Sequence, residues 1–451
     1  MSHSTWTPTS WKHFPAHQQP PYPDMQALSH ITNALSVLPP LVYPAEVERL
    51  KSSIAAAARG GGFILQGGDC AERFTDCNEQ NITNKMKILL QMSLILTYGA
   101  RKPVVRLGRI AGQYAKPRSQ AQETIEGISY PSYRGDSVND LAPDQARRVP
   151  DPERLTTAYT CSALTLNYIR AMISGGFADL RHAFEWNLHS IEKAEKWKDY
   201  RDMVETILDA IHFMESCGVN SHLLDTIDFF TSHEGLLLEY ESALTRKDPA
   251  SGRFYNLGAH MLWIGERTRQ LDGAHVEYFR GLANPVGVKI GSNADPEEVT
   301  DLIHRLNPTN EAGRVTIITR MGMDRVEKAL PPLVCAVKRS GMPVAWSCDP
   351  MHGNTRVVGE NIKTRAFAHI EAELESCFRI HRHHGTILAG VHFELTGEDV
   401  TECTGGAANL QDTDLGKNYV SSCDPRLNYS QSLEMAFLIS RLIRQYSLQE
   451  R

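Results

Sequence analysis

Eight short runs of β-type residues recur along this chain of 451 residues, and helical patterns separate most of them. The runs are Phe63–Gly67, Val104–Arg109, Leu180–Trp186, Met261–Glu266, Val286–Ile290, Val315–Arg320, Val344–Cys348 and Ile387–Glu394. The helical patterns include Asn81–Tyr98, Leu155–Met172, Pro296–Leu306, Asp324–Ser340 and Lys363–His384. Strands that alternate with helices predict an α/β protein, most simply a (β/α)8 TIM barrel. A doubly wound open sheet is the alternative, but no GxGxxG sequence follows the first run.

The chain has an N-terminal extension and two long connections that a plain barrel does not need. Residues 1–59 are the predicted extension, in which clustered prolines favour extended backbone before two helices expected at Met25–Val37 and Pro44–Arg59. Residues 60–451 are then the predicted catalytic barrel, and a helix expected at Ser430–Arg444 ends it.

The two long connections are Gln113–Ile173, which holds a loop and a helix, and Asn187–Asn256. The second contains an apolar stripe at helical spacing, formed by Val204, Ile207, Leu208, Ile211 and Met214, after a shorter helix expected around Ile191, Ala194 and Trp197. We therefore predict a helical insertion at about 187–220. Connections of this length either carry function or regulation or pack against the outside of the barrel.

Composition excludes several classes of protein. The apolar fraction of 41% and the charged fraction of 22% are ordinary for a globular enzyme, and the net charge of −6 argues against a nucleic-acid partner. The nine cysteines form no CxxC pair, which indicates a reducing compartment. No apolar run approaches the roughly 20 residues that span a bilayer, and the first residues lack the apolar core of a signal peptide. A cytoplasmic location without membrane contact is expected.

Four side chains that can bind a metal follow the predicted strands. Gly67 and Gly68 allow a sharp turn after the first run, and Cys70 follows. The other three are His352 after the seventh run, Glu394 at the end of the eighth, and Asp424 in the loop beyond it. One thiolate, one imidazole and two carboxylates suit manganese, cobalt, iron or zinc, whereas magnesium and calcium prefer oxygen ligands alone. A lone cysteine here is more often a small core residue, so the prediction depends on all four sharing one barrel mouth.

A second set of side chains at the same strand ends is cationic. It comprises Arg109, Lys116, Arg118, Arg267, Lys289 and Arg320. One or two of these cations are expected to pair with nearby carboxylates. The rest need an anionic ligand, and phosphate or carboxylate is the natural one, because arginine binds such groups with paired hydrogen bonds. There are enough cations for two phosphorylated substrates.

Ten sequence stretches, spread over nearly the whole chain, carry a family resemblance. They are Ser10-Trp11-Lys12, QQPPY at Gln18–Tyr22, GGDCAE at Gly67–Glu72, RIAGQYAKPRS at Arg109–Ser119, WIGERTRQLDGAH at Trp263–His275, NPVGVKIG at Asn284–Gly291, TRMG at Thr319–Gly322, CDPMHGNT at Cys348–Thr355, ELTGEDVTECTGG at Glu394–Gly406 and CDPRLN at Cys423–Asn428. In these stretches the chain resembles the class II 3-deoxy-D-arabino-heptulosonate 7-phosphate (DAHP) synthases, which catalyse the first step of the shikimate pathway. No departure from the family pattern falls at the positions that matter.

The resemblance implies a role for each candidate residue. A divalent metal, manganese or cobalt with zinc, iron or cadmium as alternatives, would be held by Cys70, His352, Glu394 and Asp424. Phosphoenolpyruvate would be held by Arg109, Glu266, Lys289 and Arg320, with Arg267 and Lys116 also serving substrate anions. The phosphate of erythrose 4-phosphate would lie near the loop Lys116-Pro117-Arg118-Ser119.

The implied reaction is an aldol-type condensation of the two substrates and water that releases phosphate. The cations would orient phosphoenolpyruvate, and the metal would act as a Lewis acid on the aldehyde oxygen. Glu266 would orient or deprotonate the water and Lys289 would donate a proton. Because a metal-bound cysteine is a thiolate, metal affinity should fall as pH falls.

Two other functions remain open alternatives. A metal-dependent barrel hydrolase would be expected to carry histidine-rich ligation at the first strand, where this chain has only Cys70. A catalytically inactive phosphosugar-binding regulator would be expected to lose the metal ligands or the cations. For the enzyme we also expect a homo-oligomer, and an aromatic amino acid effector bound by the helices within about Ser190–Cys217 together with the N-terminal extension.

Cys423 precedes the proposed ligand Asp424, so it should lie close to Cys70. We therefore expect metal-free protein in air to form a disulfide between Cys70 and Cys423, unless the two side chains point apart.

Overall fold

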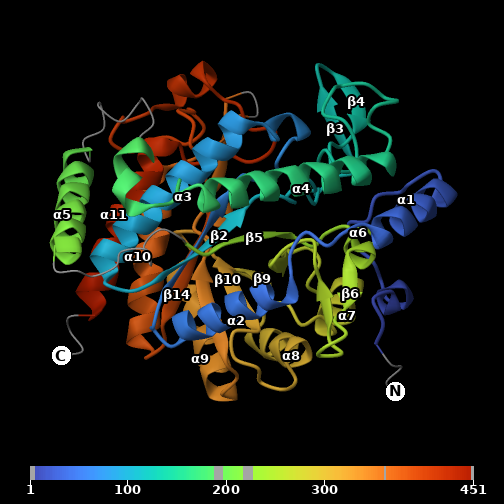
Figure 1. Ribbon diagram of the computed structural model, residues 1–451. Coiled ribbons are helices and arrows are strands. Elements are labelled where there is room, and N and C mark those ends of the chain that lie inside the picture. Colours follow the sequence, from blue (N-terminus) through green and yellow to red (C-terminus); the bar gives the residue numbers. More distant parts are fainter. Residues whose placement is uncertain (1–5, 187–196, 217–226, 360–361, 448–451) are drawn as a thin grey trace.

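The computed structural model describes residues 6–186, 197–216, 227–359 and 362–447, and these contain a closed barrel of parallel strands (Figure 1). Around the barrel the strands are β1 (Phe63–Gly68), β14 (Leu388–Glu394), β11 (Val344–Cys348), β10 (Val315–Arg320), β9 (Val286–Gly291), β8 (Met261–Ile264), β5 (Phe229–Glu234) and β2 (Val104–Arg109). The predicted (β/α)8 TIM barrel is confirmed.

Helices connect the strands and surround the barrel (Figure 1). Before β1 the chain forms α1 (Met25–Val37) and α2 (Pro44–Ala58). The later helices are α3 (Glu79–Ala100), α4 (Glu153–Ser174), α5 (Trp197–Ser216), α6 (Leu238–Ala243), α7 (Ala274–Arg280), α8 (Pro296–Leu306), α9 (Val326–Ser340), α10 (Phe367–His383) and α11 (Tyr429–Ser447). Helix α8 illustrates how the sequence specifies them, because Asp295 caps its first turn and Val299, Leu302, Ile303 and Leu306 form its buried face.

Short elements fill the connections. The 3-10 helices are η1 (Ser10–His13), η2 (Phe74–Asp76), η3 (Leu180–Trp186), η6 (His352–Asn354) and η7 (Asp412–Lys417). Three two-stranded hairpins lie outside the barrel: β3 (Gln122–Ile125) with β4 (Ile128–Pro131), β6 (Thr245–Lys247) with β7 (Phe254–Asn256), and β12 (Thr355–Val358) with β13 (Ile362–Arg365).

The prediction that Leu180–Trp186 is a barrel strand is wrong. These residues form η3, where the Asp179 carboxylate accepts a hydrogen bond from the backbone N–H of Arg181 at 2.9 Å and the indole of Trp186 donates to the carbonyl of Phe177 at 2.7 Å. Both bonds close the chain on itself within a few residues, so the backbone coils.

The third barrel strand is β5, whose sequence FFTSHE has apolar residues only in its first half. Its polar residues face buried partners inside the protein. Ser232 donates to the carbonyl of Gly108 at 3.0 Å, and the His233 ring lies 2.9 Å from the Glu241 carboxylate. Because polar side chains of a strand can find hydrogen-bond partners inside the protein, a buried strand need not be an apolar run.

The predicted helix Lys363–His384 begins later than expected. Helix α10 starts at Phe367, and Ile362–Arg365 instead pairs with Thr355–Val358 as the hairpin β12–β13. The β-branched residues Ile362 and Thr364 suit this extended backbone. In the insertion, Val204 and Ile211 lie buried on α5 as the stripe predicts, whereas Ile191 and Ala194 lie outside the described residues.

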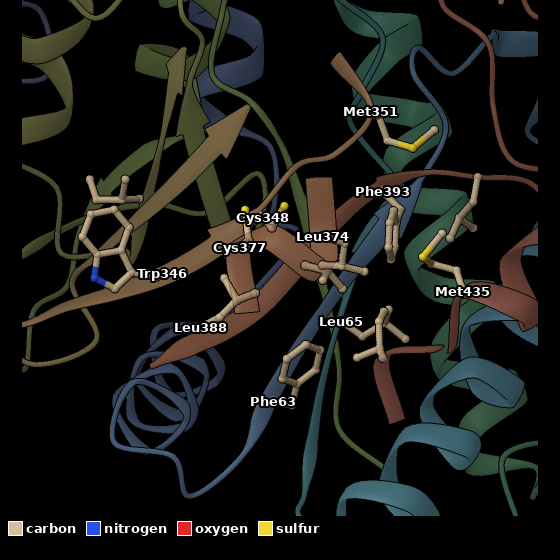
Figure 2. Packing of buried hydrophobic residues seen from close by; sticks show 14 of the residues in the cluster. Phe63, Leu65, Trp346, Cys348, Met351, Leu374, Cys377, Leu388, Phe393 and Met435 are labelled. Carbon is tan, nitrogen blue, oxygen red and sulfur yellow. The ribbon is translucent and has the colours of Figure 1, made fainter. Parts of the chain in front are cut away.

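Two apolar layers hold the barrel. Inside it, Ile64 packs with Val105, Phe230 and Met261, and Leu50 and Ile54 of α2 belong to the same cluster. Outside it, Phe63, Leu65 and Phe393 lie between the strands and the helices α10 and α11 (Figure 2). Helix α2 therefore lies at the amino ends of the strands, and the carboxyl ends lie at the opposite end of the barrel. In the described ranges no helix is long and apolar enough to cross a membrane.

Helices α3 and α11 pack so closely at Gly99 that we predict Gly99→Ala to be destabilising. A Cβ atom built on Gly99 would lie 2.7 Å from Cβ of Ser440 and closer still to its hydroxyl. Overpacking of this kind should lower the free energy of unfolding by about 1–3 kcal/mol, against a helix-propensity gain of under about 1 kcal/mol.

Urea denaturation of Gly99→Ala, Ser440→Gly and the double variant measures this effect. The double variant should be more stable than Gly99→Ala alone, because the opposing side chain is gone. Gly416→Ala is the matched control, since nothing lies within 4 Å of the added Cβ. Equal free energies of unfolding for Gly99→Ala and wild type would show that α3 and α11 do not pack closely at Gly99.

Candidate active site

Strand register brings three functional positions to one level at the carboxyl end of the barrel. Gly68 of β1 pairs with Arg109 of β2 on one side and with Glu394 of β14 on the other. Gly68 has a φ of +148°, and a Cβ there would lie 2.4 Å from the carbonyl oxygen of Arg109. Only glycine permits this close approach. Cys70, two residues further on, is thereby placed at the barrel mouth beside Arg109 and Glu394.

All candidate residues except Arg118 and Ser119 line one narrow pocket at this mouth. They are Cys70, Arg109, Lys116, Glu266, Arg267, Lys289, Arg320, His352, Glu394 and Asp424. Arg118 and Ser119 line an adjoining pocket of about 280 Å³, which shares Lys116, Arg267 and Asp424 with the first. The two sets of residues, metal-binding and cationic, therefore meet in one composite site.

The four candidate metal ligands converge, with His352 slightly apart from the others. One ligand atom each from Cys70, Glu394 and Asp424 lies within 4.8 Å of the other two. The Cys70 sulfur is 3.6 Å from Oδ2 of Asp424, and Nε2 of His352 is 3.0 Å from Oε1 of Glu394.

The surroundings of these atoms suit a bound cation. The Lys116 ammonium contacts the Cys70 sulfur and lies 2.6 Å from Oδ2 of Asp424. Burial alone would raise the pKa of Asp424, but Lys116 and other cations hold it well below its usual range. Burial raises the pKa of the Cys70 thiol well above its usual value. Two ionised carboxylates, those of Asp424 and Glu394, therefore flank a sulfur that would become a thiolate if a metal displaced its proton.

His352 is oriented by a residue that the sequence analysis did not single out. Asp349 is fully buried, and its Oδ2 lies 2.7 Å from Nδ1 of His352 and 2.8 Å from Nζ of Lys289. The Asp349 carboxylate accepts from Nδ1 of His352, which leaves Nε2, 3.0 Å from Oε1 of Glu394, as the atom that would bind a metal. The sequence contained a signal for this role, because Asp349 stands three residues before His352 in the stretch CDPMH.

Two cations of the first pocket lie near one aromatic ring. Arg109 and Lys289 lie 5.2 and 5.8 Å from the centre of the Trp263 ring. Arg320 donates to the carbonyl of His352 at 3.0 Å, and its Nε has no hydrogen-bond partner among the described residues. Glu266 accepts from the backbone N–H of Gly291 at 2.6 Å, which fixes its carboxylate at the edge of the pocket.

In the adjoining pocket, Arg267 donates to the hydroxyl of Ser119 at 2.7 Å. Arg118 pairs with Glu123, and its backbone N–H donates to the side chain of Gln18 at 2.9 Å. The N-terminal extension therefore contacts the loop that carries Lys116–Ser119.

Three further residues line or support the site without having been predicted. Arg365 is fully buried and pairs with Glu394 at 2.7 Å, and Lys363 pairs with Asp424 at 2.8 Å. Both lie in the hairpin that the sequence suggested was helical. Glu234 lines the first pocket, and burial raises the pKa of its carboxyl. Glu234 is the last residue of β5, and because the sequence analysis did not recognise that strand, it did not show that Glu234 lies at a strand end.

We predict that metal-free protein exposed to air forms a disulfide between Cys70 and Cys423. The two thiols are within hydrogen-bonding reach of each other and share one cluster with Tyr133. Oxygen would accept the two electrons and two protons that the thiols lose. Peptide mapping of chelated, air-exposed protein should recover the two cysteines as one linked pair, and thiol plus metal should restore activity. Two free thiols in protein that has lost activity would contradict this prediction.

Comparisons with known proteins agree with this geometry. The model of the class-II DAHP synthetase family matches residues 6–440. A phospho-2-dehydro-3-deoxyheptonate aldolase of Streptomyces coelicolor is 48% identical over 435 residues, covering 96% of this chain and 97% of the relative. A protein of the same name from Neurospora crassa is 49% identical over 457 residues, covering 98% of this chain and 95% of the relative. The chain therefore belongs to the class-II DAHP synthetase family.

Proposed function

We propose that the barrel mouth catalyses the condensation of phosphoenolpyruvate with erythrose 4-phosphate and water to give 3-deoxy-D-arabino-heptulosonate 7-phosphate and phosphate. The enzyme is thus a transferase, a DAHP synthase of aromatic biosynthesis. The observation that carries the proposal is one pocket in which the ligand group of Cys70, Glu394 and Asp424, together with His352, meets five cations, in a chain of this family.

A divalent metal would complete the site. Cys70, His352, Glu394 and Asp424 would hold it, and manganese or cobalt suits their mixture of sulfur, nitrogen and oxygen, with zinc, iron or cadmium as alternatives. When bound, the metal supplies a Lewis acid for the oxygen of the aldehyde substrate. Because the Lys116 ammonium lies among the ligand atoms, it would have to move away for a metal to bind there.

The clamp for phosphoenolpyruvate consists of Arg109, Lys289 and Arg320. Arg109 is 2% exposed and donates to the backbone carbonyls of Asp69 and Cys70, so its guanidinium cannot swing away. Arg320 approaches from the opposite part of the barrel, and its Nε has no hydrogen-bond partner within the described ranges. Groups fixed in this way hold carboxylate and phosphate so that one face of the enol points at the aldehyde.

Proton transfer falls to two residues of the same pocket. Burial lowers the pKa of Lys289, which is also paired with Asp349, so this ammonium gives up its proton more readily than a free lysine. Glu266 lies at the pocket edge next to Arg267, where it can orient the attacking water. The phosphate of erythrose 4-phosphate fits the adjoining pocket of Lys116, Arg118, Ser119 and Arg267.

The assay that tests this function measures phosphate release from phosphoenolpyruvate with and without erythrose 4-phosphate, before and after chelation. Release should need both substrates and should stop when the metal is removed. Release without erythrose 4-phosphate would favour a metal-dependent hydrolase, and no release in metal-loaded protein would favour an inactive phosphosugar-binding regulator.

Removal of one metal ligand should abolish turnover while the fold persists. We predict that Cys70→Ala and His352→Ala lose bound divalent metal, because each removes one of four donors. Elemental analysis of dialysed protein measures the metal, and far-UV circular dichroism checks the fold. Cys335→Ala is the matched control, since this cysteine is remote on α9. Wild-type rates from Cys70→Ala in metal-free buffer would end the assignment.

Loss of one clamp arginine should weaken phosphoenolpyruvate binding more than it changes the unfolding temperature. A charge-assisted hydrogen bond contributes roughly 1.5–3 kcal/mol, so Arg320→Ala should raise the dissociation constant about ten- to a hundred-fold. Arg109→Ala should do the same with a larger loss of stability, because it leaves Glu394 with one partner fewer. Calorimetric titration with phosphoenolpyruvate gives the constants. Unchanged affinity in both variants would place the substrate elsewhere.

Regulation is assigned to the parts outside the barrel, residues 1–59 and the insertion at about 187–220. In the described part of the insertion, α5 buries Tyr200, Met203 and Val204, and the helix contacts α3 and η3; residues 190–196 and 217 lie outside the described residues. An aromatic amino acid bound there, in a homo-oligomeric cytoplasmic enzyme, would act through a coupling free energy of roughly 1–3 kcal/mol.

We predict that deletion of Ser190–Cys217 leaves catalysis but removes feedback inhibition. Steady-state rates with tryptophan, phenylalanine and tyrosine, singly and in pairs, measure the effect. If none of these mixtures inhibits the intact enzyme, the regulatory assignment is wrong.

A further inference from the structure

Three buried polar side chains lie inside the barrel directly below the candidate active site. They are Gln66 of β1, His392 of β14 and Ser232 of β5, and Gln66 pairs with His392 in the strand register. The chain neighbours Leu65 and Phe393 pack outward against the helices (Figure 2). Because side chains alternate along a strand, Gln66 and His392 point into the barrel. Polar groups buried in this way need hydrogen-bond partners.

Four hydrogen bonds connect these side chains to Arg109. Nη1 of Arg109 lies 2.6 Å from Nε2 of His392, and Nδ1 of His392 lies 2.8 Å from Oε1 of Gln66. The amide nitrogen of Gln66 donates to the Ser232 hydroxyl at 3.0 Å, and this hydroxyl donates to the carbonyl of Gly108 at 3.0 Å. Gly108 directly precedes Arg109, so the series of bonds returns to the strand from which it starts.

The partners on either side determine which nitrogen of His392 carries the proton. A guanidinium has donors only, so Nε2 must accept the hydrogen bond from Arg109. Nδ1 then carries the proton and donates to the amide oxygen of Gln66, whose nitrogen is engaged with Ser232. The ring also packs edge-to-face on Trp263, with 5.1 Å between ring centroids. Gln66 therefore stabilises the tautomer of His392 that accepts from Arg109.

The bond to His392 determines which N–H group of Arg109 is left for a ligand. A guanidinium has five N–H groups. Nε donates to the carbonyl of Asp69, and Nη2 donates to the carbonyl of Cys70 and the carboxylate of Glu394. One hydrogen of Nη1 goes to His392. Within the described ranges one N–H group then remains, the second on Nη1, and Arg109 lines the pocket at the barrel mouth.

We propose that His392 is a positioning residue for phosphoenolpyruvate and acts through Arg109. By accepting one hydrogen of Nη1, it fixes the plane of the guanidinium and presents the other hydrogen to the carboxylate or phosphate of the substrate. The inference rests on the proposed function, since it takes phosphoenolpyruvate as the ligand of Arg109. Packing alone does not explain a histidine here, because an apolar ring of similar size would fill the same space.

Two substitutions of His392 separate positioning from packing. His392→Phe keeps a ring but removes the acceptor, whereas His392→Gln loses the ring but keeps an acceptor oxygen near the position of Nε2. In calorimetric titrations of the manganese-loaded enzyme, His392→Phe should bind phosphoenolpyruvate about ten-fold more weakly, and His392→Gln should stay within about three-fold of wild type. In steady-state assays of His392→Phe, KM for phosphoenolpyruvate should rise while KM for erythrose 4-phosphate stays unchanged.

A double-mutant cycle identifies the residue through which His392 acts. In an Arg109→Met background, His392→Phe should weaken binding no further, whereas in an Arg320→Met background it should again weaken binding about ten-fold. Gln66→Leu, which removes the acceptor for Nδ1, should also weaken binding and provides the test if His392→Phe does not fold. His381→Phe is the matched control, since His381 is buried on α10 outside the pocket, and it should leave the affinity unchanged.

The outcomes distinguish this inference from the proposed function. Wild-type affinity in both His392→Phe and Gln66→Leu, or equal losses in His392→Phe and His392→Gln, would overturn the inference and leave the proposed function in place. A further loss caused by His392→Phe in the Arg109→Met background would also overturn it. A wild-type enzyme that binds no phosphoenolpyruvate would refute the proposed function and, with it, the role of His392.

Discussion

The barrel mouth depends on the contacts between the buried Glu394 carboxylate and its three charged or titratable neighbours. This carboxylate is fully buried and lies 3.2 Å from Arg109, 2.7 Å from Arg365 and 3.0 Å from His352. Burial alone would raise the pKa of Glu394, but His352 and Arg365 hold it well below its usual range. Removing one partner of a buried ion pair typically costs about 3–5 kcal/mol, because a charge is left uncompensated. The same contacts that keep the mouth folded therefore keep its metal-binding carboxylate ionised.

Much of the barrel could be predicted because its strands are apolar runs in a regular alternation with helices. The exception shows the limit of this signal. β5 begins with Phe229 and Phe230 but continues with Thr231, Ser232 and His233, whose partners lie outside the strand, on His260, Gly108 and Glu241. Local patterning cannot show that a polar residue will be satisfied inside a barrel. Leu180–Trp186 has the composition of a strand, but hydrogen bonds involving its own flanking residues fold it into η3.

The candidate site residues could be found because barrel chemistry lies at strand ends, which the sequence locates. Residues that orient or neutralise these site residues were harder to find. Asp349 orients His352, and Arg365 neutralises Glu394, but neither role is visible until the loops are folded.

The most direct test of the account is the anomalous diffraction of crystals grown with manganese and phosphoenolpyruvate. We expect one manganese peak bonded to the Cys70 sulfur, Nε2 of His352 and the carboxylates of Glu394 and Asp424, with the Lys116 ammonium moved away. It also predicts phosphoenolpyruvate in contact with Arg109, Lys289 and Arg320. A manganese peak outside this ligand set, or a Lys116 ammonium that remains against Cys70 in a manganese-loaded crystal, would contradict the central claim.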